Sequence, residues 1–170
     1  ALLVFDEVQT APARTGHWFA GGLWDMEPHV ITTAKGIGAG FPVGVLLAQG
    51  SVAQTVRTGD QGTTFGGGPL ACAAVEATLS ELEEIDAPAR ARAIEERVRR
   101  RLRGREVLGH GGLLGIRCPA KETVKRLREE KRVLAATCPG DGTVMRLLPP
   151  LTIRDAELDE GLMAIEAVLS

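Results

Sequence analysis

The sequence has few cysteines, little net charge and no long apolar run. Its three cysteines, Cys72, Cys118 and Cys138, lack the close spacing of metal ligands, and their odd number argues against a disulfide framework. We therefore expect no metal site, and mostly buried free thiols in a cytoplasmic protein. A formal net charge of −2 gives no reason to expect a nucleic-acid partner. No apolar stretch approaches the roughly 20 residues that span a membrane, and no cleavable signal is visible, so we expect no membrane association.

The chain of 170 residues, 44% hydrophobic and 25% charged, has the composition of an ordinary globular protein. Its length allows one domain with a core, or one small domain plus part of another. The sequence starts at Ala1, without methionine, inside a run that resembles a buried strand. Because a domain rarely begins on a central strand, we expect the chain to be the C-terminal portion of a longer protein.

Three apolar runs in the first half predict strands of an α/β sheet. The run "ALLVF" at residues 1–5 is continuous, as in a parallel strand covered on both faces, and "HVITTAK" and "VGVLLA" follow it. The first two strands end on polar residues, Asp6 and Lys35, and ligands bind at the carboxyl ends of strands in open α/β sheets. A helix is expected from Pro69 onward, where the sequence is rich in Ala, Leu and Glu.

The second half of the sequence predicts a smaller α/β domain. Pro88 interrupts the helical pattern, so we expect domains at residues 1–86 and 87–170. After a first helix, "VLGHGGLLGIRC" predicts a glycine-bent strand and "KETVKRLREEKR" a second helix. The runs "VLAAT" and "VMRLLP" predict short strands, and a last helix ends the chain.

The first and last helices of this domain have apolar stripes that should face its core. The stripes have spacings of three or four residues and comprise Ala91, Ile94, Val98 and Leu102, and then Leu158, Leu162, Ile165 and Leu169. The basic run "RVRRRLR" lies on the other face of the first helix, and we interpret it as a solvated face. It also allows the i,i+4 ion pairs Glu95–Arg99 and Glu96–Arg100.

The acidic pair Asp6 and Glu7 at the end of the first strand has two interpretations. In a nucleotide hydrolase, Asp6 would hold magnesium and Glu7 would polarise water. Such a site needs the loop GxxxxGK followed by Ser or Thr, which this sequence does not contain. That loop could lie upstream, so a fragment of an ATPase with a Walker-B-like strand is one alternative.

The second interpretation is an organic cofactor bound at the strand ends. Lys35 precedes glycines that let the backbone approach a bulky group, and a reactive lysine there suits Schiff-base chemistry. Asp6 could keep a pyridine nitrogen protonated, and "QGTTFGGGPLA" offers hydroxyls, amides and a helix N-terminus to a phosphate. Structural roles are the alternatives: Asp6 as a turn cap, Thr63 or Thr64 as helix caps, and Arg146 as an ion-pair partner.

Four motifs occur in a fixed order: "FDEVQT…RTG", "TTAKGIGAGFPVG", "GTTFGGGPLACAA" and "RLLPPLTI". Together they closely resemble the class III (ornithine/acetylornithine-type) aminotransferases, enzymes of fold type I that depend on pyridoxal 5'-phosphate (PLP). The pattern is most similar to that of the acetylornithine aminotransferases. The resemblance implies an α/β fold in which residues 1–86 are the C-terminal part of the large PLP-binding domain and residues 87–170 the small C-terminal domain.

The resemblance also assigns a cofactor site. Asp6 would pair with the pyridine nitrogen, Val8 would pack against the ring, and Gln9 would lie near its phenolic oxygen. Lys35 would form the Schiff base and carry the proton of the 1,3-transfer. Thr64 would bind the phosphate, in this family from the partner subunit, so the resemblance implies a homodimer with shared active sites.

For the substrate, the resemblance places Thr63 beside it and Arg146 on its α-carboxylate. The implied reaction moves the ω-amino group of N-acetylornithine to 2-oxoglutarate, in arginine or lysine biosynthesis. Alternatives are ornithine, 4-aminobutyrate or a carrier-linked aminoadipate semialdehyde as substrate, a related aminomutase, or a decayed binding protein. The family's other cofactor ligands lie upstream, so we expect the 170 residues alone to be inactive. The chain also has Ala11 and Ala13 where the family usually has glycines.

Overall fold

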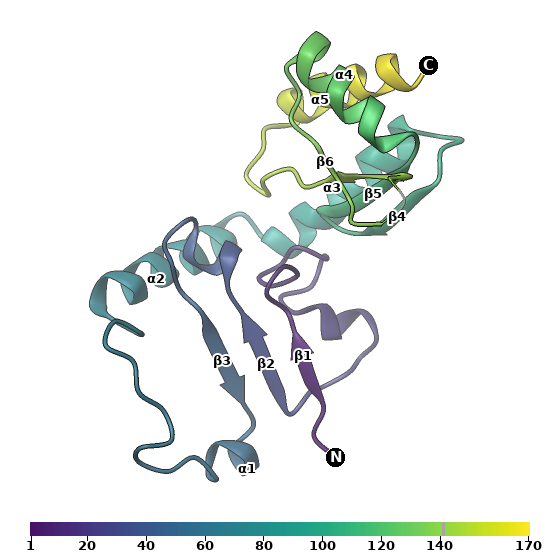
Figure 1. The fold of residues 1–170 in the computed structure, drawn as a ribbon. Coiled ribbons are helices and arrows are strands. Elements are labelled where there is room, and N and C mark those ends of the chain that lie inside the picture. Colours follow the sequence, from purple (N-terminus) through teal and green to yellow (C-terminus); the bar gives the residue numbers. More distant parts are fainter. Residues whose placement is uncertain (141) are drawn as a thin grey trace. The chain divides into compact units, whose positions relative to one another are not determined.

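The computed structural model describes residues 1–140 and 142–170, which form two compact units, Ala1–Ala87 and Pro88–Ser170 (Figure 1). Each unit contains its own β-sheet. The boundary expected from the sequence, between residues 86 and 87, lies one residue before this division. Within the described residues, no helix is both long enough and apolar enough to cross a membrane.

The sheet of the first unit has the order β1-β2-β3, with β1 at Val4–Asp6, β2 at Val30–Thr33 and β3 at Val45–Ala48. β1 and β2 are parallel, with Asp6 opposite Thr32, whereas β3 is antiparallel to β2. All three strands expected from the apolar runs are therefore present. The parallel pair matters for function because its two carboxyl ends lie at one edge of the sheet.

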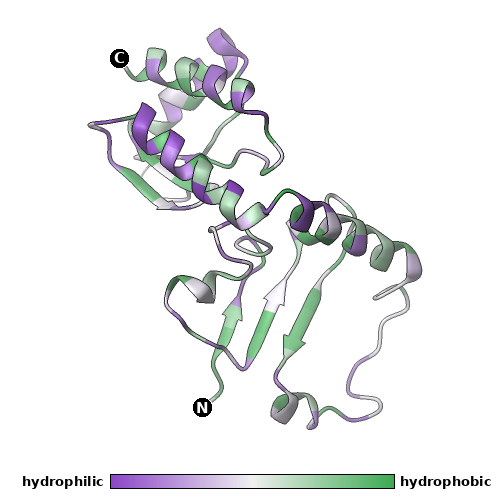
Figure 2. Cartoon of the chain, turned by 180° about the vertical axis from the view of Figure 1, so that it is seen from behind, coloured by the Kyte–Doolittle hydropathy of each residue, from purple (hydrophilic) through white to green (hydrophobic). Residues whose placement is uncertain are grey.

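β1 lies at one edge of the three-stranded sheet that residues 1–170 form, and it contacts β2. Within these residues Leu2 and Val4 are 62% and 54% exposed. Burial of residues 1–5 on both faces stays a prediction for the full-length protein. β3, the other edge strand, is hydrophobic along its length and exposes Leu46 and Leu47 (Figure 2).

Short helical segments follow the strands, and one long helix completes the first unit. The 3-10 helices η1 (Ala20–Leu23) and η2 (Lys35–Gly38) come after β1 and β2, and α1 (Gly50–Ala53) comes after β3. The long helix α2 (Pro69–Glu84) begins where the sequence predicts, because proline is well suited to the first helical position. α2 packs on η2 and so contacts the turn that starts at Lys35.

The second unit combines helices with an antiparallel sheet of order β4-β5-β7-β6. In chain order its elements are α3 (Ala87–Arg101), β4 (Val107–His110), β5 (Leu113–Arg117), α4 (Ala120–Lys131), β6 (Ala136–Thr137), β7 (Val144–Leu147) and α5 (Asp155–Leu169). One prediction was wrong: the glycine-bent strand is a hairpin of β4 and β5. Gly111, with φ of 59°, lies between them and allows the chain to reverse completely rather than bend.

The core of the second unit confirms most of the predicted helix stripes. Ile94 and Val98 of α3 have no exposed surface, and Leu162 and Ile165 of α5 are each 1% exposed. In the last turn of α5, however, the buried residue is Val168. Leu169, which we predicted to face the core, is only half-buried. A step of three residues rather than four from Ile165 keeps Val168 on the core side.

The basic face of α3 is mostly solvated, as expected, since Arg99, Arg100, Arg101 and Arg103 are exposed. Two arginines of this face also contact α5. Arg97 donates from Nε and Nη2 to the two carboxylate oxygens of Asp159, at 2.7 and 2.9 Å. Arg101 pairs with Glu166 at 2.7 Å. Bidentate arginine–carboxylate geometry therefore docks α3 on α5. The predicted i,i+4 pairs also form, Glu95–Arg99 at 2.9 Å and Glu96–Arg100 at 3.6 Å.

Candidate functional site

The carboxyl ends of β1 and β2 bring Asp6 and Lys35 to one edge of the first sheet. Asp6 is the last residue of β1 and lies opposite Thr32 of β2, and Lys35 follows two residues after the end of β2. Because the strands are parallel, both residues leave the sheet at the same edge. This register agrees with the expectation that Asp6 ends a strand next to the strand that leads to Lys35.

Asp6 has one engaged and one available carboxylate oxygen. Its Oδ1 accepts hydrogen bonds from the Val8 amide at 3.1 Å and from the Thr32 hydroxyl at 3.3 Å. Asp6 is thus a turn cap, as one alternative proposed. Within the described residues Oδ2 accepts no hydrogen bond, and the side chain is exposed. The aspartate therefore fits a protonated ring nitrogen as a further partner.

Val8 and Gln9 lie in the turn after β1, with Val8 half-buried and Gln9 exposed. The loop behind them passes through Ala13, whose φ is 60° and whose side chain has no exposed surface. A positive φ is unfavourable for alanine and free of strain for glycine, which is the residue expected there. The same loop lies against the lysine turn, since a Cβ added at Gly36 would be 3.8 Å from Pro12 Cδ.

Lys35 begins η2 in a left-handed conformation, with φ of 49°. That conformation costs a non-glycine residue about 1 kcal/mol, and strained backbone is common at functional sites. The side chain is exposed and makes no ion pair within the described part of the chain. The amine is therefore available to react with a carbonyl group.

Thr63 and Thr64 lie on an exposed segment, residues 53–67, that leads into α2. Thr63 Oγ1 accepts a hydrogen bond from the Gly66 amide at 3.1 Å and closes a small turn. Neither threonine caps α2, whose N-cap is Gly68 without a side-chain hydrogen bond, so the capping alternative was wrong. Neither of them bonds to the strand-edge residues in the described chain, and their assigned roles stay predictions.

In the second unit, β7 carries Arg146, whose Nε is buried without a hydrogen-bond partner among the described residues. A buried guanidinium nitrogen is costly to leave unpaired, so this atom requires an acceptor, which water or a ligand can supply. The alternative that Arg146 is an ion-pair partner finds no support in the part of the chain that the structure describes. A carboxylate is the acceptor that best matches the arginine fork.

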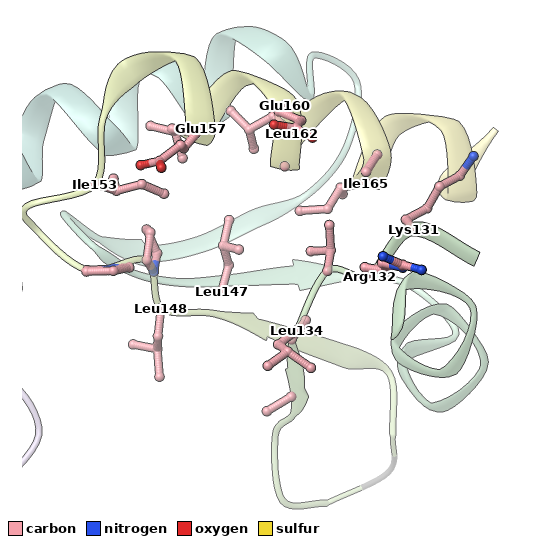
Figure 3. A pocket seen from close by; sticks show the side chains of 18 of the residues that line it. Lys131, Arg132, Leu134, Leu147, Leu148, Ile153, Glu157, Glu160, Leu162 and Ile165 are labelled. Atoms are coloured by element: carbon pink, nitrogen blue, oxygen red, sulfur yellow. The ribbon is translucent and has the colours of Figure 1, made fainter. Parts of the chain in front are cut away.

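Arg146 lines a pocket of about 900 Å³ between α5 and the strands β6 and β7 (Figure 3). Charged side chains of both signs contribute to the pocket: Lys131 at the end of α4, Arg132 directly after it, and Glu157 and Glu160 on α5. Its apolar lining includes Leu134, Leu147, Leu148 and Ile153. The pocket therefore combines apolar walls with charged groups.

Glu7 is the residue that the sequence left without a clear function. It is 2% exposed, and its carboxylate accepts hydrogen bonds from Thr10 Oγ1 at 2.8 Å and from the amides of Ala20 at 2.7 Å and Gly21 at 3.2 Å. A buried carboxylate with three donors cannot also polarise a water beside a metal. Among the described residues, moreover, no cluster of three His, Cys, Asp or Glu side chains could hold a metal ion. Glu7 therefore does not fit the water-polarising role that the nucleotide-hydrolase alternative requires.

Sequence reasoning missed this role because the donors lie 3, 13 and 14 residues after Glu7. The sequence did offer one signal, because Glu7 directly follows an apolar strand. An unpaired charge that is buried there would be costly, so donors for Glu7 were to be expected.

The sequence model of the class-III aminotransferase family matches residues 1–169. The chain belongs to the class-III aminotransferases. These enzymes are PLP-dependent. The α/β fold is accordingly that of PLP-dependent transferases of fold type I.

The curated class-III relatives include many acetylornithine aminotransferases. The enzyme of Methanothermobacter thermautotrophicus is 37% identical over 179 residues, covering 99% of this chain and 45% of the relative. The enzyme of Bacillus subtilis is 35% identical over 179 residues, covering 100% of this chain and 46% of the relative. The chain thus spans slightly less than half the length of these relatives.

Solved class-III structures have the same fold. The ornithine aminotransferase of Toxoplasma gondii matches with a TM-score of 0.90 at 29% identity, covering 99% of this chain and 43% of that one. The acetylornithine aminotransferase of Elizabethkingia anophelis matches with a TM-score of 0.89 at 31% identity, covering 99% and 48%. A further structure of the Toxoplasma enzyme, crystallized in the presence of oxidized glutathione, has partial occupancy of PLP at its active site.

Proposed function

We propose that the full-length protein is a PLP-dependent aminotransferase that moves the ω-amino group of N-acetylornithine to 2-oxoglutarate. The observation that carries this proposal is the placement of Asp6 and Lys35 at one sheet edge in a class-III chain. The identity of 35–37% to acetylornithine aminotransferases supports this choice of donor. The proposed activity belongs to cytoplasmic arginine or lysine biosynthesis and to the full-length protein, not to residues 1–170 alone.

When bound, PLP supplies an electron sink for the charge that develops at the substrate carbon. In the proposed site Asp6 would hold the ring nitrogen in its protonated form. Val8 would pack against the ring, Gln9 would lie near its phenolic oxygen, and Thr64 would bind the phosphate. Lys35 would hold the cofactor through Nζ and would move a proton as a general base and acid.

The remaining assignments concern the substrate and the assembly. Arg146 binds the substrate carboxylate, which would supply the acceptor that its buried Nε lacks, and Thr63 lies beside the substrate. We assign Ala1–Ala87 to the C-terminal part of the large PLP-binding domain and Pro88–Ser170 to the small domain. The proposed homodimer shares its active sites, with Thr64 acting on the partner's cofactor.

The test of this function uses the full-length protein with added PLP. The parent should show the visible absorption band of lysine-bound PLP, and Lys35→Ala should lose both this band and all transamination. Lys125→Ala is a matched control, because Lys125 is also exposed but belongs to α4 of the second unit and to none of the four motifs. A parent protein without the band, or a Lys35→Ala variant that still transaminates, would rule the proposal out.

Ornithine is the second candidate donor, because the ornithine aminotransferase of Toxoplasma gondii matches the fold with a TM-score of 0.90. Comparing kcat/KM for N-acetylornithine, ornithine and 4-aminobutyrate separates the candidates. We expect N-acetylornithine to have the highest value. A higher value for ornithine would reassign the donor while leaving the reaction class unchanged.

A further inference from the structure

Glu7 is a buried acid beside the cofactor residues, and the proposed chemistry makes no use of it. It directly follows Asp6, yet its side chain is 2% exposed whereas that of Asp6 is exposed. Successive residues of a strand point to opposite sides, so the two carboxylates face different surroundings. Asp6 is directed to the ligand edge, and Glu7 is directed into the loop that follows.

The side chain of Glu7 ties together both ends of that loop. Its Oε2 accepts from the Thr10 hydroxyl at 2.8 Å and from the Ala20 amide at 2.7 Å, and its Oε1 accepts from the Gly21 amide at 3.2 Å. Thr10 lies where the loop leaves the turn, and Ala20 and Gly21 begin η1, where the loop ends. One carboxylate thus closes a loop of more than ten residues.

The backbone of Glu7 fixes the same point of the chain. Its amide donates to the Thr32 carbonyl at 2.8 Å, which extends the β1–β2 ladder beyond Asp6. Its carbonyl accepts from the Ala11 amide at 3.1 Å. Val8 and Gln9 lie between these attachment points, so their positions depend on the closure that Glu7 provides.

We propose that Glu7 is a positioning residue: its carboxylate holds the loop so that Asp6, Val8 and Gln9 are pre-arranged for the cofactor ring. This inference rests on the proposed function of the sheet edge. It does not place Glu7 in contact with the cofactor. Pre-arrangement lowers the ordering cost of binding, so its loss should weaken cofactor binding.

The chemistry at this point requires a carboxylate rather than an amide. All three of its donors need acceptors, and both oxygens of Glu7 are used. In Glu7→Gln an NH₂ group replaces one oxygen, so it would face the Ala20 or the Gly21 amide and leave that N–H unpaired in a buried position. The size of the side chain hardly changes, so the substitution alters the charge and the hydrogen bonds of the carboxylate but not its packing.

The test measures PLP binding to the full-length apo-protein by equilibrium dialysis, together with the visible band and the melting temperature. We expect Glu7→Gln to raise the Kd for PLP at least tenfold. Thr10→Val removes one donor of the three and should raise Kd less, by roughly threefold, in line with the loss of a single hydrogen bond. Glu81→Gln, an exposed carboxylate on α2, should leave Kd unchanged.

The outcomes separate positioning from mere stability and from failure of the proposed function. An unchanged Kd in Glu7→Gln overturns the positioning role. If Glu7→Gln does not fold, Thr10→Val decides. A raised Kd for PLP together with an unchanged melting temperature supports positioning, and an unchanged Kd refutes it. A parent protein that binds no PLP refutes the proposed function itself. Equal PLP binding by the parent and by Glu7→Gln refutes only the positioning role.

Discussion

At the scale of residues, the structure separates side chains that are free to meet a ligand from those that hold the chain together. Asp6 and Glu7 are neighbours of the same chemical type, but one is exposed with a free oxygen and the other is buried with three donors. Arg146 is intermediate, because it is partly buried and its Nε is unpaired among the described residues. In Asp6 and Arg146, unmet hydrogen-bonding capacity agrees with the proposed ligand-binding roles.

Replacing Arg146 tests its proposed role with the substrate. Arg146→Gln in the full-length protein removes a charge-assisted hydrogen bond worth roughly 1.5–3 kcal/mol, so we expect KM for the donor to rise by about 10- to 100-fold. The visible PLP band should not change. Arg103→Gln, an exposed arginine of the same unit, is the control and should leave KM unaltered. Parent-like KM in Arg146→Gln would show that the carboxylate binds elsewhere.

Arg132 has a strained backbone conformation at the C-terminal end of α4. Arg132 caps α4 with φ of 56°, and the following amide, of Val133, donates to the Leu127 carbonyl at 3.0 Å. Glycine suits this left-handed position, so Arg132→Gly should raise the free energy of unfolding by about 0.5–1 kcal/mol in denaturant titrations. Arg132→Ala should give no such gain, since alanine has the same steric cost. Equal stability of the two variants would contradict this account.

At the scale of elements, α3 and α5 are joined by a cluster of ion pairs. Asp155 is bound by Arg90 at 2.6 Å and by Arg97 at 2.7 Å, and Asp159 is bound by Arg97 at 2.7 Å. Hydrogen bonds from these arginines lower the pKa of both aspartates from their usual value of 3.8. The cluster therefore links the association of the two helices to the protonation of Asp155 and Asp159.

The sign of this linkage predicts loss of stability in acid. The unfolded chain protonates these aspartates more readily than the folded chain, so their contribution is complete above the usual pKa of 3.8 and is lost as the pH falls below it. The melting temperature should therefore drop between pH 5 and pH 2.5, and Asp159→Asn should flatten this dependence. Glu83→Gln, an exposed carboxylate on α2, should retain the parent slope. A parent-like slope in Asp159→Asn would exclude this linkage.

At the scale of the whole molecule, sequence patterns predicted the strands, helices and buried faces that depend on local apolar periodicity. The strands β1 to β3, the helix α2 and the buried stripe of α3 follow from apolar spacing, and the strand ends place Asp6 and Lys35 correctly. What the sequence did not predict depends on contacts between distant residues. Arg97 meets Asp159, 62 residues away, and Glu7 meets donors across a loop, which no local pattern encodes.

The hairpin of β4 and β5 was missed for a different physical reason. Four residues in a row, Gly109 to Gly112 with one histidine among them, allow a bend or a full reversal equally well. The pairing of β5 with β7 selects the reversal, and it involves a strand almost thirty residues later in the chain.

The assigned residues are divided between two units that each have their own sheet, and this has an evolutionary consequence. Asp6 and Lys35 belong to Ala1–Ala87, whereas Arg146 belongs to Pro88–Ser170. Under the proposed roles, substitutions around Arg146 can therefore change how a substrate carboxylate is bound without disturbing the strands that carry Asp6 and Lys35. Carboxylate recognition and the strands of the cofactor residues can then evolve separately.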